Sequence, residues 1–307
     1  METAFLFPGQ GSQIPNLLDD LPHENIIKQT VDEASEILGY DIRLLQSKKK
    51  LESTKNVQIC LLVSGVAVYR YFLDTAHIPT FVAGHSVGAF GAAVASEVLS
   101  FEDALNTVAL RGQLMEQIHP EGYGMIVVLG MDHRQLQKII DKNYTNENPV
   151  YLANINSQTQ ITVSGSREGL EKVIEDAREN GANCANFLSV NTPSHSPLLS
   201  TVSEQLKKEM KGVTISDPKI KYVSNYNARV LYDGHDVIKD LYLSIASSVQ
   251  WDDVTSILYE NGVRYFQEIP PNNVLTKLIN NKYSDIRALA VSETNLDDCK
   301  YVLEKMK

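Results

Sequence analysis

Short apolar runs alternate with helical patterns along most of the chain. Residues 3–7 and 81–84 are nearly all apolar, which is typical of strands buried on both faces. Residues 24–75 and 101–118 repeat apolar side chains at helical spacing. Further along, the pattern predicts helices at 198–210, at 236–244 and from Trp251 onward, and strands at 219–224 and 264–268. Such alternation predicts an α/β fold with a parallel sheet.

Residues 122–190 follow a different pattern. Strands are expected at 125–131, 150–154, 160–164 and 183–190, with helices at 134–142 and 167–180. This β-α-β-β-α-β order is that of a ferredoxin-like fold. We therefore expect a large parallel-sheet domain, built from residues 1–121 and 191–307, with a ferredoxin-like small domain of residues 122–190 inserted into it.

The segment Gly84-His85-Ser86-Val87-Gly88 joins an apolar strand to a helix of small residues. This order predicts a hydrolase-like nucleophile elbow, in which Ser86 lies on a sharp turn and its hydroxyl is exposed at a helix N-terminus. Gly84 and Gly88 would let neighbouring backbone approach closely. Ser86 is the candidate nucleophile.

A serine nucleophile needs a base, and the chain has seven histidines. His195 is the best candidate, because it lies where the chain re-enters the large domain, just before a helix start at Ser196-Pro197. His85 adjoins Ser86, but the turn should aim its side chain away, so we interpret it as a packing residue. The other five histidines lie in surface-like or loop contexts.

Two further features allow both a structural and a functional interpretation. The loop Pro8-Gly9-Gln10-Gly11-Ser12-Gln13 is either a plain turn or a cradle for an anion or carbonyl group at the end of a central strand. Arg111 in a largely apolar helix is either a surface residue with a buried stem or a functional cation. Gly112 favours the second interpretation, because it leaves room beside the guanidinium.

The composition of the 307 residues narrows the classes of partner and site. A net charge of −10 argues against non-specific nucleic-acid binding. The three cysteines are far apart in sequence and no ligand set has metal spacing, so we expect a reducing compartment and no metal. The N-terminus lacks a signal-peptide pattern, and no apolar run is expected to span a membrane. Together these predict a cytoplasmic enzyme without a membrane partner.

Five motifs in the same order resemble the malonyl-CoA:acyl carrier protein transacylase family. The resemblance runs from Phe5 to about Leu278 and rests on Phe7-Pro8-Gly9-Gln10-Gly11-Ser12-Gln13, Gly84-His85-Ser86-Val87-Gly88, Arg111-Gly112, Pro193-Ser194-His195 and Val249-Gln250-Trp251. It implies that a malonyl group passes from malonyl-CoA to Ser86 and then to the phosphopantetheine thiol of an acyl carrier protein. No permanently bound cofactor is implied, because the partner carries the phosphopantetheine.

The resemblance also implies residue roles. His195 would be the general base, and Arg111 would bind the free carboxylate of malonate. The resemblance further implies an oxyanion hole from the backbone amides of Gln10 and Val87, orientation of His195 by the backbone carbonyl of Gln250, and contact of Asn156 with the pantetheine arm.

This chain departs from the family's fatty-acid-synthesis members at two places. Ala89-Phe90 replaces an acidic residue after the elbow, and Pro270-Pro271-Asn272 replaces Gly-Pro-Gly. Both are more similar to the transacylase (epsilon) subunit of malonate decarboxylase, and acyltransferases of polyketide synthesis are a third possibility. The carrier protein is therefore open.

Charge does not decide how the acidic carrier protein binds. The cations after His195 would form a basic docking surface or a solvated helix face interleaved with acidic residues; they are Lys207, Lys208, Lys211, Lys219, Lys221 and Arg229.

Two other functions compete with acyl transfer. A patatin-like serine hydrolase or thioesterase would use a Ser–Asp dyad, for which Asp233-Gly234 is available. A non-catalytic scaffold would only bind the carrier protein, but the combination of Ser86, His195 and Arg111 argues against it.

Overall fold

The computed structural model describes residues 2–75, 77–119 and 121–306, and its large sheet has six strands. The strand order is β10-β9-β1-β2-β7-β8, and all neighbours run parallel except the pair β7 and β8. The strands are β1 (Glu2–Phe7), β2 (Phe81–Gly84), β7 (Lys221–Val223), β8 (Val230–Leu231), β9 (Val263–Glu268) and β10 (Arg287–Ala290). The expected parallel α/β sheet is confirmed.

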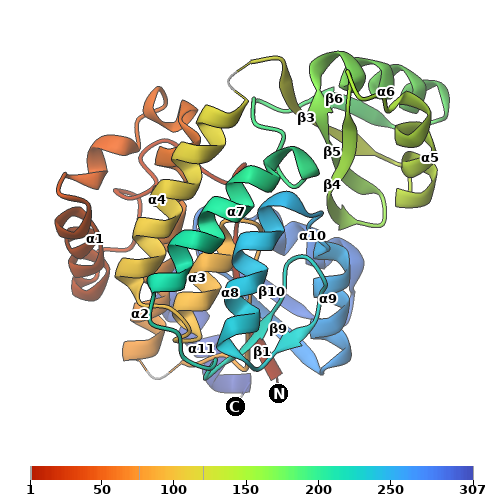
Figure 1. Ribbon diagram of the computed structural model, residues 1–307. Helices are drawn as coiled ribbons and strands as arrows, with labels where there is room; N and C mark the ends of the chain where they lie inside the picture. The colour runs from red at the N-terminus through yellow and green to blue at the C-terminus, as the bar shows by residue number, and fades with distance from the viewer. Residues whose placement is uncertain (1, 76, 120, 307) are drawn as a thin grey trace.

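Helices cover both faces of this sheet, and strand β1 shows why. Its side chains alternate, so Phe5 and Phe7 pack into one hydrophobic core while Ala4 and Leu6 pack into another on the opposite face. The nine α-helices around the sheet within the described residues are α1 (Asn25–Leu38), α2 (Thr54–Asp74), α3 (Gly88–Ala95), α4 (Phe101–Ile118), α7 (Ser200–Glu209), α8 (Gly234–Leu243), α9 (Trp251–Glu260), α10 (Val274–Lys282) and α11 (Leu296–Met306). Figure 1 places α1, α2 and α4 on one side of the molecule and α9 and α10 on the other.

Short 3₁₀ helices join or extend several of these elements. They are η1 (Ile42–Leu45), η2 (Lys50–Glu52), η3 (Pro197–Leu199), η4 (Met210–Gly212) and η5 (Ser244–Ala246). Of these, η5 directly continues α8 and lies beside the candidate site.

A small four-stranded sheet forms the separate unit at the upper right of Figure 1. Its strand order is β4-β5-β3-β6, and all its neighbouring pairs are antiparallel. The elements run β3 (Tyr123–Leu129), α5 (His133–Asn143), β4 (Val150–Ser157), β5 (Gln160–Ser166), α6 (Arg167–Glu179) and β6 (Cys184–Phe187). This is the expected ferredoxin-like order, with β3 beginning two residues earlier and β6 ending three residues earlier than the pattern indicated.

Helix α2 corrects one expectation. Its 21 residues are long and apolar enough to cross a membrane by length and composition, although no run of that kind was expected. Yet 83% of its most apolar window is buried inside the protein. Its side chains pack in the hydrophobic core that also contains Phe5 and Phe7 of β1, so core packing accounts for the apolar composition.

The candidate site lies where parallel strands of the large sheet end. The loop after β1, the elbow after β2 and the turn after β7 follow neighbouring strands and meet at the same edge. This edge faces the small sheet, whose strand β4 forms a bridge from Asn154 to Val249.

Candidate active site

The segment after β2 has the backbone of a nucleophile elbow. Ser86 has a positive φ of 56°, and α3 begins two residues later at Gly88. A Cβ at Gly84 would lie 2.1 Å from the backbone of Gly88, and a Cβ at Gly88 would lie 2.1 Å from the carbonyl oxygen of Phe7. Only glycine fits at either position without backbone movement.

The structure brings the candidate nucleophile Ser86 and the candidate base His195 into hydrogen-bond contact. The Oγ of Ser86 lies 2.8 Å from Nε2 of His195, and both residues are buried. The other ring nitrogen, Nδ1, lies 2.6 Å from the carbonyl oxygen of Ser244. Because a carbonyl only accepts, Nδ1 carries the hydrogen and Nε2 is free to accept the serine proton.

The expected role of Gln250 is wrong. The main-chain carbonyl that orients His195 belongs to Ser244, at the end of α8. The carbonyl of Gln250 instead accepts the amide of Val254, in the first turn of α9. The physical reason is helix geometry: Gln250 caps α9, so its carbonyl is used within that helix, whereas the carbonyl of Ser244, directly after α8, reaches the imidazole.

His195 is electrically neutral in this environment. Burial, and next the positive charge of Arg111, lower the pKa of His195 from 6.5 to about 3, while the hydrogen bond that Nδ1 donates to the carbonyl of Ser244 acts in the opposite direction. The C-terminal end of α8 would stabilise the imidazolium that forms when the ring takes a proton. The ring is thus neutral before a substrate enters, with Nε2 free to act as a base.

Arg111 is a buried cation beside the serine. Only 1% of its surface is exposed, its Nη2 lies 3.2 Å from Oγ of Ser86, and its Nη1 lies 2.6 Å from Oε1 of Gln58. Its Nε has no partner, and no carboxylate pairs with the guanidinium among the described residues. Burial lowers the pKa of Arg111 to about 9, so the group is still charged at neutral pH. A buried charge without a counter-ion is costly, and an incoming anion would offset that cost.

Gly112 leaves room for a neighbouring helix, as its place beside Arg111 suggested. A Cβ there would lie 2.4 Å from the Cα of Lys55, so the glycine lets α2 approach α4. One helical turn after Lys55, Gln58 then reaches the guanidinium of Arg111.

The two residues assigned to the oxyanion hole lie near Ser86, since Val87 follows it in the chain and Gln10 lines the same cavity. Within the described part of the chain, the backbone hydrogen bonds include none donated by Gln10 or Val87. Gly9 holds the Gln10 loop close to the elbow, since a Cβ at Gly9 would lie 2.5 Å from the carbonyl oxygen of His85. Neither amide is therefore committed to a main-chain acceptor, as an oxyanion hole requires.

Asn156 and His85 form a polar pair next to the site. The Oδ1 of Asn156 lies 2.9 Å from Nε2 of His85, and the His85 ring packs edge-on against Trp251 with ring centroids 5.5 Å apart. The packing interpretation of His85 fits this geometry. Asn156 lines the cavity adjoining the one that contains Ser86.

Three adjoining cavities extend from Ser86 along the junction between the two sheets. The first, of about 280 Å³, is lined by Ser86, Arg111, Gln58, Met115 and His195 among others. The second, of about 250 Å³, shares the Gln10 loop and His85 with it. The third, of about 440 Å³, shares Gln160 and Leu278 with the second.

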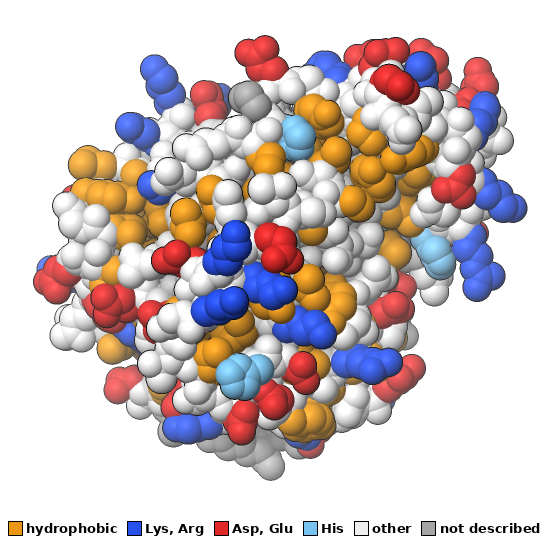
Figure 2. Space-filling model, viewed as in Figure 1, with side chains coloured by type: hydrophobic (Ala, Val, Ile, Leu, Met, Phe, Trp, Pro, Cys, Tyr) orange, Lys and Arg blue, Asp and Glu red, His pale blue; other side chains and the backbone are white. Residues whose placement is uncertain are grey.

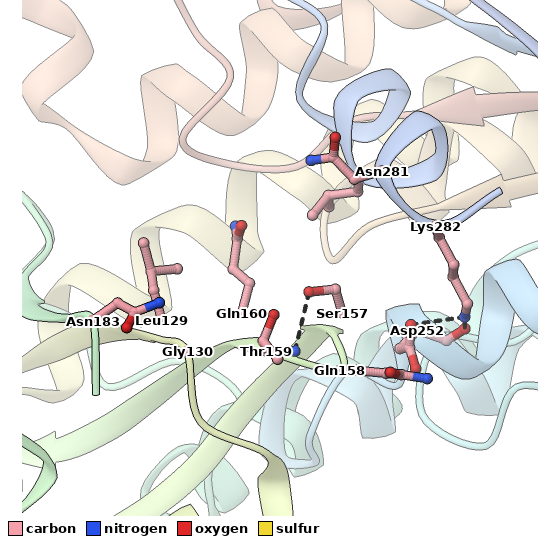
Figure 3. Close-up of a pocket in the computed structure, with 11 residues that line it drawn as sticks. Leu129, Gly130, Ser157, Gln158, Thr159, Gln160, Asn183, Asp252, Asn281 and Lys282 are labelled. Carbon is pink, nitrogen blue, oxygen red and sulfur yellow. Dashed lines mark hydrogen bonds and ion pairs between the residues drawn. The ribbon is translucent and has the colours of Figure 1, made fainter. Parts of the chain in front are cut away.

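Figure 3 shows the third cavity between the hairpin of the small domain and α10. The side chain of Gln160 projects toward α10, Asn281 lines the opposite wall, and Lys282 is paired with Asp252 at 2.7 Å. In the described residues no group of three or more His, Cys, Asp or Glu side chains could hold a metal ion.

The Ser–Asp dyad of a patatin-like hydrolase is not formed. Asp233 caps α8, and its carboxylate accepts the amide of His235. The side-chain partners of the Ser86 hydroxyl are His195 and Arg111.

Comparisons with known proteins agree with this geometry. The acyl transferase domain family matches residues 4–302. The chain belongs to this family. It is 37% identical to the malonyl CoA-acyl carrier protein transacylase of Bacillus subtilis, over 94% of this chain and 93% of that protein. It is 32% identical to the protein of the same name in Escherichia coli K12, over 94% and 96% of the two chains.

Solved structures show the same fold. FabD from Acinetobacter baumannii superposes with a TM-score of 0.94 at 31% identity, covering 100% of this chain and 99% of that one. A malonyl-transacylase in complex with a type II polyketide acyl-carrier protein gives a TM-score of 0.91 at 31% identity, covering 96% and 97%. The chain is an acyltransferase with the two-domain fold of these structures.

Three residues of the site were missed from the sequence, and two of them left a signal. Gln58 is a lone amide within an apolar helical run, and Asn225 follows a parallel strand at the edge where ligands bind. The Oδ1 of Asn225 accepts the amide of Ser86 at 3.1 Å. Ser244 acts through its main-chain carbonyl, which no side-chain pattern reveals.

Proposed function

We propose that this acyltransferase moves a malonyl group from malonyl-CoA to the phosphopantetheine thiol of an acyl carrier protein. The observation that carries the proposal is the buried, unneutralised guanidinium of Arg111, 3.2 Å from the hydroxyl of Ser86. An acyl group with a free carboxylate would offset the cost of that charge and gain two parallel hydrogen bonds. An acyl group without a carboxylate would leave the charge unpaired.

The first half-reaction would form an ester on Ser86. His195 takes the hydroxyl proton on Nε2 while Oγ attacks the thioester carbonyl. The amides of Gln10 and Val87 stabilise the oxyanion. When the tetrahedral intermediate collapses, the C–S bond breaks and the CoA sulfur leaves with the proton from His195.

The second half-reaction would run the same steps in the opposite direction. The thiol of the carrier protein gives its proton to His195, attacks the malonyl ester and releases Ser86. The three cavities would hold the pantetheine arm, with Asn156 and Gln160 at its amides. These steps use only side chains and main-chain amides, with the phosphopantetheine supplied by the partner.

We also propose that residues 122–190 form the small domain and residues 1–121 and 191–307 the large one, so that the channel lies at their junction. A cytoplasmic location is proposed from the free state of Cys60, Cys184 and Cys299, which suits a reducing compartment.

A transfer assay with two carrier proteins tests this function. The protein is loaded from malonyl-CoA and offered, side by side, the holo-carrier of fatty acid synthesis and that of malonate decarboxylase. We expect malonyl-carrier to accumulate, and the faster partner identifies the pathway. Release of free malonate with neither carrier loaded would contradict the proposal and indicate a hydrolase.

A further inference from the structure

The side chain of Asn225 forms hydrogen bonds with the elbow on both sides of Ser86. Its Oδ1 accepts the amide of Ser86 at 3.1 Å, and its Nδ2 donates to the carbonyl of Gly84. Ser86 has a positive φ, which is a strained conformation for a serine and needs support from its surroundings. Two hydrogen bonds from one buried amide provide that support.

Asp240 in turn holds Asn225. Its carboxylate accepts the amide of Asn225 at 2.9 and 3.1 Å on its two oxygens, the hydroxyl of Ser224 at 2.6 Å and the hydroxyl of Tyr222 at 2.6 Å. The amide of Tyr226 donates to it as well, at 3.2 Å. Asp240 is fully buried, and within the described residues no lysine or arginine pairs with it. A buried acceptor surrounded only by donors fixes their positions closely.

The main chain of Asp240 is connected to His195, the candidate base, by a series of hydrogen bonds. Its carbonyl accepts the amide of Ser244, one helical turn later. The carbonyl of Ser244 holds Nδ1 of His195 at 2.6 Å, and the carbonyl of Ile245 accepts the backbone amide of His195 at 3.0 Å. His195 also has a positive φ, of 61°, so its placement depends on these contacts.

The two chains of hydrogen bonds meet at one residue. We propose that Asp240 is a positioning residue that sets the separation of Ser86 and His195, with its side chain fixing the elbow through Asn225 and its main chain fixing the turn that holds the imidazole. The inference rests on the proposed roles of Ser86 and His195. Asp240 lines none of the three cavities, and its carboxylate has no contact with Ser86 or His195 among the described residues.

A set of variants separates this role from a general contribution to stability. Asp240→Ala removes the carboxylate that accepts the backbone amide of Asn225. Asn225→Ala removes the two side-chain hydrogen bonds to the elbow and leaves the Asp240 carboxylate in place. Asp240→Asn keeps one oxygen for Ser224 and Asn225, so it should retain more activity than Asp240→Ala. Tyr222→Phe is the matched control, because it removes a donor from Asp240 without touching the bonds of Asn225 to the elbow.

The readout is the rate constant of single-turnover malonyl loading at saturating malonyl-CoA, below each variant's melting temperature. The Kd for malonyl-CoA is measured with each change in a Ser86→Ala background. We expect Asp240→Ala and Asn225→Ala each to lower the rate constant about tenfold with Kd unchanged, as for loss of alignment rather than of binding. Tyr222→Phe should load at the wild-type rate. The rate constant of the double variant Asp240→Ala with Asn225→Ala should be little lower than that of either single variant, because both residues act in one chain of contacts.

The results discriminate between two failures. Wild-type loading rates in both alanine variants, or fully additive losses in the double variant, would overturn the role of Asp240. If Asp240→Ala does not fold, the comparison of Asn225→Ala with Tyr222→Phe decides in the same way. Malonyl loading that persists in Ser86→Ala would instead overturn the proposed function itself.

Discussion

The amide oxygen of Gln58 lies 2.6 Å from Nη1 of Arg111, so a neutral group orients the buried guanidinium. The amide nitrogen of Gln58 faces the sulfur of Met115 at 3.2 Å, which fixes which end of the amide meets the arginine. A carboxylate at this position would orient the guanidinium equally well but would neutralise it. The neutral partner leaves the full charge for a substrate carboxylate.

Gln58→Glu should therefore impair malonyl loading more than acetyl loading. The new carboxylate would pair with Arg111 and compete with the malonyl carboxylate. A hydrogen bond to a charged group is worth ~1.5–3 kcal/mol, so we expect a selectivity loss of about tenfold or more. The kcat/KM ratio for malonyl-CoA against acetyl-CoA checks this, with Gln58→Leu as the control that removes the hydrogen bond without adding charge. An unchanged ratio in Gln58→Glu would contradict the account.

Arg111→Ala should sharply lower malonyl loading and leave acetyl loading much less affected. Only the malonyl group has the carboxylate that the guanidinium would bind. Competition between the two CoA esters in one reaction measures the ratio directly. Equal losses for both would show that Arg111 acts on the serine or the fold instead.

Much of the fold followed from the sequence, because buried strands and amphipathic helices leave clear patterns. Strands β8 and β10 and helices α10 and α11 were not predicted; the two strands have only two and four residues, too few for an alternating pattern to show. Ser86 and Arg111 could be found because their residue type is unusual in its setting. The wrong role for Gln250 arose because a main-chain carbonyl acts by its position at a helix end, which only the fold determines.

The acid limit of malonyl loading should lie well below pH 6.5. Burial, with Arg111 next, lowers the pKa of His195 from 6.5 to about 3, so the base is unprotonated through mildly acidic pH. Single-turnover loading across pH checks this. A loss of rate with a midpoint at or above pH 6.5 would contradict the low pKa.

The same shift predicts a pH dependence of stability. Between pH 6.5 and about 3 the unfolded chain binds a proton at His195 that the folded chain does not, so this residue's contribution to stability falls as pH falls through that window. On acidification, the free energy of unfolding of wild type, measured by denaturant titration, should fall relative to that of His195→Gln. A constant difference between them would show that His195 does not titrate in this way.

Gly88→Ala should disrupt the elbow. The added Cβ would lie 2.1 Å from the carbonyl oxygen of Phe7, which cannot move without shifting the central strand. Backbone strain of this kind costs ~1–3 kcal/mol, so both the melting temperature and malonyl loading should fall. Gly212→Ala is the matched control, since a Cβ there meets nothing within 4 Å. Equal stability of the two variants would argue against close packing at the elbow.

The lysines over α7 and α8 offer a test of carrier docking. Figure 2 shows Lys and Arg side chains gathered over these helices, and Lys207, Lys208 and Lys211 are exposed there. If an acidic carrier protein docks on this face, Lys207→Glu with Lys211→Glu should raise KM for the carrier and leave KM for malonyl-CoA unchanged. Lys48→Glu with Lys49→Glu makes the same change of net charge elsewhere. An unchanged KM for the carrier in the first variant would show that this face is only solvated.

Peptide mapping of the loaded protein tests the central claim most directly. The protein is mixed with malonyl-CoA, its intact mass is measured, and the modified peptide is sequenced by tandem mass spectrometry. The account predicts one malonyl group as an ester on Ser86, absent in Ser86→Ala and lost when holo-carrier protein is added. A malonyl group on any other residue, or one that persists in Ser86→Ala, would contradict it.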